Sequence, residues 1–134
     1  MPINICAEPL EPFPAVPARA FEIEGYKVIL SGHFIGRYRQ YVQSNMTNAE
    51  VEVRVTRGLQ NREYQQFHFR RGHHKATKYL IDKTMIFAVD YRAEVLHFIT
   101  AYPSVGCGWY ERAWSMGWRG IPFDWDKLIK GVGK

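Results

Sequence analysis

The sequence of 134 residues contains few features of a membrane protein, a secreted protein or a disulfide-rich scaffold. It has no run of about eighteen consecutive apolar residues, which excludes a transmembrane helix and argues against a membrane partner. Its first residues, MPINICAEPLEPFP, do not place a basic segment before an apolar one, as a signal peptide would. We therefore expect a cytoplasmic site of action. The two cysteines, Cys6 and Cys107, are expected to be free thiols in such a chain.

The sequence also lacks the ligand patterns of most metal sites. A two-metal nuclease needs clustered carboxylates, and Asp and Glu are not clustered in this chain. A structural zinc site favours two ligand pairs with short internal spacing, and the zinc-peptidase pattern HExxH is absent as well. We therefore predict no metal and no cofactor. Because histidine is abundant in one window, a metal-dependent nuclease stays as an alternative.

Positive charge is concentrated in one part of the chain. The formal net charge is +5 and the pI is near 9.3. Residues 51–83 contain eight cationic and three acidic residues, so this segment accounts for the whole excess. A local excess indicates an anionic partner, which we interpret as RNA. A solvated surface that only favours solubility is the alternative.

The length and a hydrophobic content of 46% are typical of one globular domain. Residues 1–18 hold five of the seven prolines and are predicted to form an extended arm. Residues 19–134 are then a single basic domain. Residues 20–30 are expected to form a short strand or turn, and residues 31–45 have helical apolar spacing after Ser31, a plausible N-cap.

Two pairs of strands are predicted after this helix. Residues 51–57 and 62–70 alternate polar and apolar side chains around a break containing glycine, which predicts an antiparallel hairpin. Its exposed face would carry Arg54, Gln66, His68 and Arg70. Residues 84–92 and 94–103 are apolar on both faces and predict a central hairpin. The fold class is therefore α+β, with an N-terminal helix packed on a four-stranded antiparallel sheet and an aromatic C-terminal segment.

The window FHFRRGHHKATKYL, residues 67–80, combines three histidines with several cationic side chains. RNA cleavage by its own 2′-hydroxyl needs a base for that hydroxyl and an acid for the leaving 5′-oxygen, and imidazole can supply both near neutral pH. Cationic side chains can stabilise the charge that develops on phosphorus. The composition of the window therefore favours an RNA-cleaving site.

Two short motifs resemble a known group of nucleases. FITAYP, residues 98–103, resembles the Thr-x-Tyr-Pro strand of EndoU-type ribonucleases. LSGHFIGRYRQ, residues 30–40, resembles the Ser-x-His-x-x-x-Arg helix of small members of the barnase–EndoU–colicin–RelE superfamily of toxin and phage ribonucleases. The resemblance covers about residues 27–104. It implies RNA cleavage on a fold with an N-terminal helix followed by a four-stranded antiparallel sheet.

The resemblance also implies roles for individual residues. Thr100 and Tyr102 match the strand motif, and His33 and Arg37 match the helix motif. The expected catalytic residues are His33, His73, His74, Lys75, Thr100 and Tyr102. The expected RNA-binding residues, taken from the helix motif and from the basic segment of residues 54–78 together, are Arg37, Arg54, His68, Arg70, Arg71 and Lys78.

The sequence thus predicts a small basic endoribonuclease that acts on RNA without a metal. A cognate inhibitor or immunity protein is a further expected partner. The alternative from another class is a non-catalytic module that binds nucleic acid or protein, such as an inhibitor in a phage or toxin system. His97 is expected to be a buried histidine. The four tryptophans are interpreted as core or cover residues rather than as platforms for RNA bases.

Overall fold

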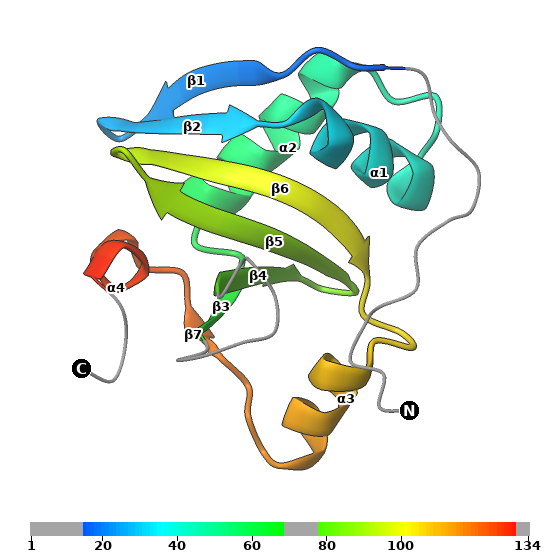
Figure 1. The fold of residues 1–134 in the computed structure, drawn as a ribbon, viewed down its shortest axis with the longest axis vertical. Coiled ribbons are helices and arrows are strands. Elements are labelled where there is room, and N and C mark those ends of the chain that lie inside the picture. The colour runs from blue at the N-terminus through cyan, green and yellow to red at the C-terminus, as the bar shows by residue number, and fades with distance from the viewer. Residues whose placement is uncertain (1–14, 69–77, 131–134) are drawn as a thin grey trace.

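The computed structural model describes residues 15–68 and 78–130 (Figure 1). Within these ranges the chain forms seven strands and four helices, an α+β fold. The elements in chain order are β1 (Arg19–Ile23), β2 (Tyr26–Leu30), α1 (Gly32–Val42), α2 (Asn48–Gln60), β3 (Gln65–His68), β4 (Lys78–Asp82), β5 (Met85–Arg92), β6 (Val95–Pro103), α3 (Gly108–Ser115), β7 (Ile121–Pro122) and α4 (Trp125–Lys130).

The strands form one mixed sheet in the order β1-β2-β6-β5-β4-β3-β7. Strands β2 and β6 are parallel, and the other neighbouring pairs are antiparallel. The predicted four-stranded antiparallel sheet is therefore wrong in strand number and in orientation. The hairpin of β5 and β6 is confirmed, and residues 20–30 form most of a second hairpin, β1 and β2, which extends the sheet beyond β6.

The predicted strand at residues 51–57 is wrong, because these residues lie in α2. Thr47 caps this helix by accepting a hydrogen bond from the backbone N–H of Glu50, whose carboxylate accepts one from the N–H of Thr47 in return. Val51 and Val55 are wholly buried, whereas Val53 is 53% exposed. This burial follows the helical period, so the valines that alternate in sequence do not share one face of a strand.

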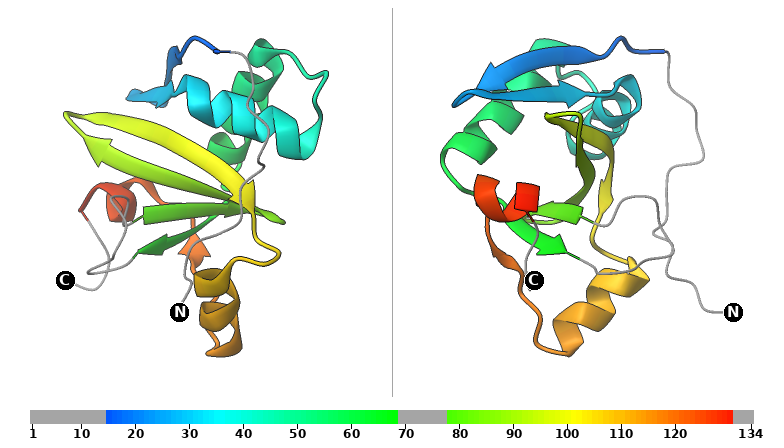
Figure 2. Two further views of the ribbon diagram at one scale, coloured as in Figure 1. Left: turned by 45° about the vertical axis from the view of Figure 1, so that its right-hand side comes forward. Right: turned by 60° about the vertical axis from the view of Figure 1, so that its left-hand side comes forward.

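Two hydrophobic clusters occupy the two faces of the sheet. The first face packs against α1, α2 and α4, and its core includes Phe34, Val55, Phe87 and Phe98. The second face packs against α3 and is lined by the buried side chains of Phe67, Tyr79, Ile81, Ile86, Ala88, Tyr102, Cys107, Trp109 and Ala113. Figure 2 shows α3 on a different side of the sheet from α1 and α2.

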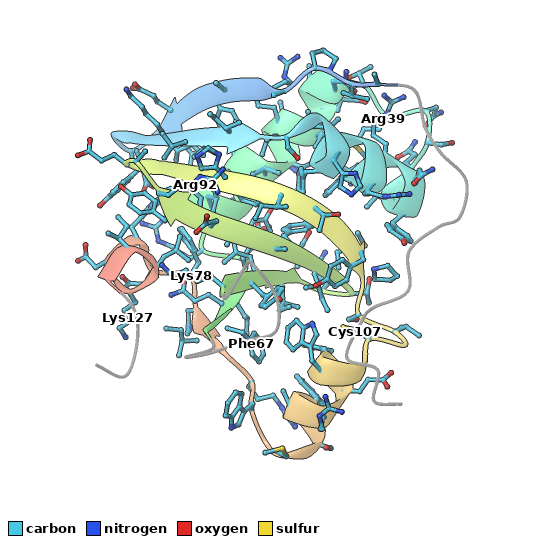
Figure 3. All side chains as sticks on the ribbon, in the orientation of Figure 1. Arg39, Phe67, Lys78, Arg92, Cys107 and Lys127 are labelled. Atoms are coloured by element: carbon cyan, nitrogen blue, oxygen red, sulfur yellow. The ribbon has the colours of Figure 1, made fainter. Side chains whose placement is uncertain are left out.

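The aromatic C-terminal segment covers the sheet as predicted, but only in part. Trp109 and Trp125 are buried, as core or cover residues should be, whereas Trp114 and Trp118 are each 48% exposed. Cys107, labelled in Figure 3, is wholly buried and disulfide-bonded, so the expectation of a free thiol is wrong at this position. No helix in the described ranges is long and apolar enough to cross a membrane.

Candidate active site at the rim of the sheet

The start of α1 is fastened directly to β6. The backbone N–H of Ser31 donates to the carbonyl of Phe98 at 3.1 Å, and its hydroxyl donates to the carbonyl of Ile99 at 2.9 Å. The same hydroxyl also accepts a hydrogen bond from the backbone N–H of Phe34 at 2.9 Å. Ser31 therefore caps α1 and also bonds it to β6, and we call this pair of contacts the Ser31 clamp. His33 lies two residues after Ser31, and Thr100 directly follows Ile99 in β6. These bonds therefore hold the backbone around His33 close to the backbone around Thr100.

A bulge in β6 determines which way its motif faces. In the pairing of β5 with β6, Val89 lies opposite Phe98 and Ala88 lies opposite Thr100, so Ile99 is an extra residue. Without the bulge, strict alternation would turn Thr100 toward the same face as Phe98. With it, Thr100 and Tyr102 lie on the second face, as their partners across the pair do.

One row of α1 ends at this second face. His33, Arg37 and Tyr41 are spaced by four residues and therefore lie along one side of the helix. Tyr41 packs against both hydrophobic clusters, which places this end of the row at the rim between them. Arg37 donates to the side-chain oxygen of Gln40 at 2.9 Å, a contact that orients its guanidinium. His33 is exposed to solvent.

Thr100 carries a polar atom that the fold leaves unsatisfied. Its hydroxyl oxygen is buried and has no hydrogen-bond partner among the described residues. A buried hydroxyl without a partner costs about 1–3 kcal/mol of stability. Such a group is expected where a ligand supplies the missing partner, and Thr100 directly follows Ile99, the residue of β6 that is bonded to Ser31.

Two phenols extend the site across the sheet. Tyr102 is 8% exposed and makes a side-chain hydrogen bond with Tyr79 of β4. Burial raises the pKa of Tyr79 to about 12, and the hydrogen bond with Tyr102 offsets part of that rise. Tyr79 lies in the histidine-rich window but was not predicted as a site residue. Its position follows from the pairing of strands, because Tyr79 lies opposite Ala88 of β5, which in turn lies opposite Thr100 of β6.

His97 is a second residue of this face that the sequence does not predict as part of the site. It was expected to be buried, but it is partly exposed and lies opposite Asp90 in the pairing of β5 with β6. Its strand neighbours belong to the first cluster, so alternation turns His97 to the second face. Burial lowers the pKa of its imidazole, Arg92 lowers it further, and Asp90 opposes both effects.

Several predicted RNA-binding residues lie elsewhere. Arg54 is exposed on α2, which packs on the first face and not beside Thr100. Gln66 was predicted on an exposed face with Arg54, but it is 1% exposed and its oxygen accepts a bond from the backbone of Asp124 at 3.2 Å. The prediction that Arg54 and Gln66 share an exposed cationic face is therefore wrong. Arg54 lies in a helix instead of the predicted strand, and Gln66 is buried.

Lys78 is occupied by a contact inside the protein. Its ammonium donates to the carbonyl of Leu128 in α4 at 2.6 Å, and Figure 3 shows its side chain directed toward α4. Burial lowers the pKa of Lys78, whereas Asp90 raises it. Lys78 therefore supports the packing of α4 rather than extending freely from the sheet.

The remaining predicted residues belong to the segment that follows β3. His68 ends β3 and pairs with Lys78 through the backbone. Arg70, Arg71, His73, His74 and Lys75 lie outside the described residues, as does the side chain of His68. Their proposed roles stay predictions.

In the described parts of the chain, no three His, Cys, Asp or Glu residues are grouped as a metal site would require. Comparison of the chain with protein-family models, curated proteins and solved structures finds no match.

Proposed function

We propose that this protein is an endoribonuclease that cleaves RNA by attack of the 2′-hydroxyl on the adjacent phosphate. The observation that carries the proposal is that α1, which carries His33 and Arg37, is bonded through Ser31 to the stretch of β6 that directly precedes Thr100. The two motifs that resemble the barnase–EndoU–colicin–RelE superfamily are far apart in the sequence, and they contain His33, Arg37, Thr100 and Tyr102.

The proposed reaction requires two proton transfers. A base removes the proton of the 2′-hydroxyl as its oxygen bonds to phosphorus, and an acid gives a proton to the 5′-oxygen as its bond to phosphorus breaks. The products are a 2′,3′-cyclic phosphate and a 5′-hydroxyl. His33 supplies one imidazole, exposed to solvent and therefore accessible to RNA. One of His73 and His74 supplies the second in this proposal.

The remaining residues of the rim would hold the phosphate. Arg37, oriented by Gln40, can donate to two phosphate oxygens at once. The unsatisfied hydroxyl of Thr100 can donate a third bond. Tyr102, whose side chain is hydrogen-bonded to Tyr79, offers a phenol on the same face of the sheet as Thr100. Such preorganised donors stabilise charge that develops in the transition state.

End-group analysis tests this proposal. Purified protein is mixed with labelled RNA in EDTA and, separately, in added manganese. We expect fragments with 2′,3′-cyclic phosphate ends and equal rates in both conditions. Products with 5′-phosphate ends, or a rate that depends on the metal, would favour the metal-dependent alternative; binding without cleavage would favour the non-catalytic module.

His73 and His74 can be tested in the same assay. The proposal assigns the second proton transfer to one imidazole of the two, so His73→Ala and His74→Ala should not have equal effects. One of them should lower the rate by about a hundredfold to ten-thousandfold, the usual effect of removing an acid or base. Full activity of the double variant would remove both residues from the mechanism.

A further inference from the structure

The end of helix α3 and the turn after it expose large apolar side chains. Both views in Figure 2 show α3 extending away from the sheet. Trp114 and Trp118 are each 48% exposed, and Met116 between them is 66% exposed. Exposed tryptophans grouped in this way are uncommon on a surface that has no partner, because they leave apolar area in contact with water.

A continuous series of ring contacts joins this surface to the candidate active site. Tyr79, which is bonded to Tyr102, packs against Trp109 with ring centroids 4.6 Å apart. Trp109 meets Tyr110 at 5.8 Å, and Tyr110 meets Trp114 at 6.0 Å with an angle of 33° between the rings. The aromatic surface therefore begins at the second face of the sheet and continues outward along α3.

An arginine side chain is held against the rings of this surface. The guanidinium of Arg119 lies 3.5 Å from the centre of the Trp114 ring. Its NH1 nitrogen donates to the carbonyl of Trp114 at 2.8 Å and to that of Trp118 at 3.2 Å. These bonds fix a planar charge against a planar ring, and Arg119 itself is exposed. Among the described residues both bonds use NH1, so the second terminal nitrogen can face an anion.

We propose that Tyr110, Trp114, Trp118 and Arg119, here called the α3 platform, bind unpaired bases and the adjoining phosphate of single-stranded RNA. This inference rests on the proposed function and extends it by naming a substrate class, RNA that is unpaired beside the cleaved bond. Aromatic rings accept any base by stacking, and arginine adds both stacking and a phosphate contact. The guanidinium held against Trp114 and the ring contacts that continue to Tyr79 favour RNA over an apolar protein partner.

The test uses a fluorescent single-stranded RNA with every 2′-hydroxyl methylated, so that it binds but cannot be cleaved. Its Kd is measured by anisotropy at ~0.15 M salt. Stacking on one aromatic residue contributes enough that Trp114→Ala should weaken binding about five- to a hundredfold. Trp114→Phe should retain most of the affinity. Met116→Ala is the matched control, since it removes exposed apolar area without a ring, and its Kd should stay within about twofold of the wild type.

The outcomes separate this inference from the proposed function. Weakened binding by Trp114→Ala and Trp118→Ala, with native circular dichroism, supports the α3 platform even if no cleavage of ordinary RNA is found. Cleavage by the wild type together with unchanged Kd in both variants overturns the platform and leaves the proposed function standing. Equal losses in Met116→Ala and Trp114→Ala, or self-association that Trp114→Ala abolishes without affecting RNA binding, would assign the surface to a protein contact and overturn the inference.

Discussion

Replacing Thr100 by valine should make the protein more stable and less active. The buried hydroxyl of Thr100 has no partner among the described residues. Valine has nearly the same shape and puts a methyl group in place of the oxygen. The substitution therefore removes a desolvation penalty of about 1–3 kcal/mol without opening a cavity. We expect the free energy of unfolding to rise by about 1 kcal/mol, and Tm to rise by roughly 3–5 °C for a chain of this size.

The same hydroxyl is proposed to bond to the phosphate of RNA. A hydrogen bond to a charged group contributes about 1.5–3 kcal/mol, which corresponds to about a tenfold to hundredfold loss in kcat/KM when the donor is removed. Urea denaturation and single-turnover cleavage on the same preparations measure both effects. The conjunction of higher stability and lower activity is the expected signature of a polar group retained for function.

Thr56→Val is the matched control, because Thr56 lies on α2, the helix that packs on the other face of the sheet. Its effect on the free energy of unfolding should stay within about 0.5 kcal/mol, with unchanged cleavage. Lower stability in Thr100→Val would show that the hydroxyl has a partner in the folded protein. Unchanged activity would remove Thr100 from the site.

Three further predictions concern the scaffold. A side chain at Gly58 would place its Cβ 2.2 Å from the ring of Tyr64, so Gly58→Ala should destabilise the protein by at least about 1–3 kcal/mol in urea; an unchanged midpoint would contradict this packing. The hydrogen bond from Arg62 lowers the pKa of Glu24 below its ordinary 4.5, so its stabilisation is present above that pH and is lost on acidification. The stability difference between wild type and Glu24→Gln should therefore shrink as pH falls through this range, and a constant difference would refute the assignment. Ser31→Ala removes the cap of α1 and its bond to β6, so it should cost about 1–2 kcal/mol by thermal denaturation, whereas a loss near zero would argue against the clamp.

Local signals were enough to predict part of the fold. Ser31 and the apolar spacing after it predict α1, and two apolar runs around a short turn predict β5 and β6. The error at α2 arose because Val51 and Val55 fit both a period of two and a spacing of four. The capping box of Thr47 and Glu50 distinguishes the two periods, and it is visible in the sequence.

Other features depend on contacts that are distant in sequence. The parallel pairing of β2 with β6 joins segments about seventy residues apart, and no local pattern specifies it. The bulge at Ile99 likewise depends on the register with β5. The motif residues Thr100 and Tyr102 could be predicted as candidates by resemblance, but their shared face could not. Tyr79 was missed because an apolar strand gives a buried phenol no distinctive signal.

The most direct test of the account is the single-turnover rate of RNA cleavage by wild type and by His33→Ala, measured in EDTA. His33 is exposed, so its removal should leave the fold intact, as circular dichroism can verify. We predict cleavage by the wild type to a 2′,3′-cyclic phosphate and a rate about a hundredfold to ten-thousandfold lower in the variant. Absence of cleavage by the folded wild type, or equal rates in the two proteins, would contradict it.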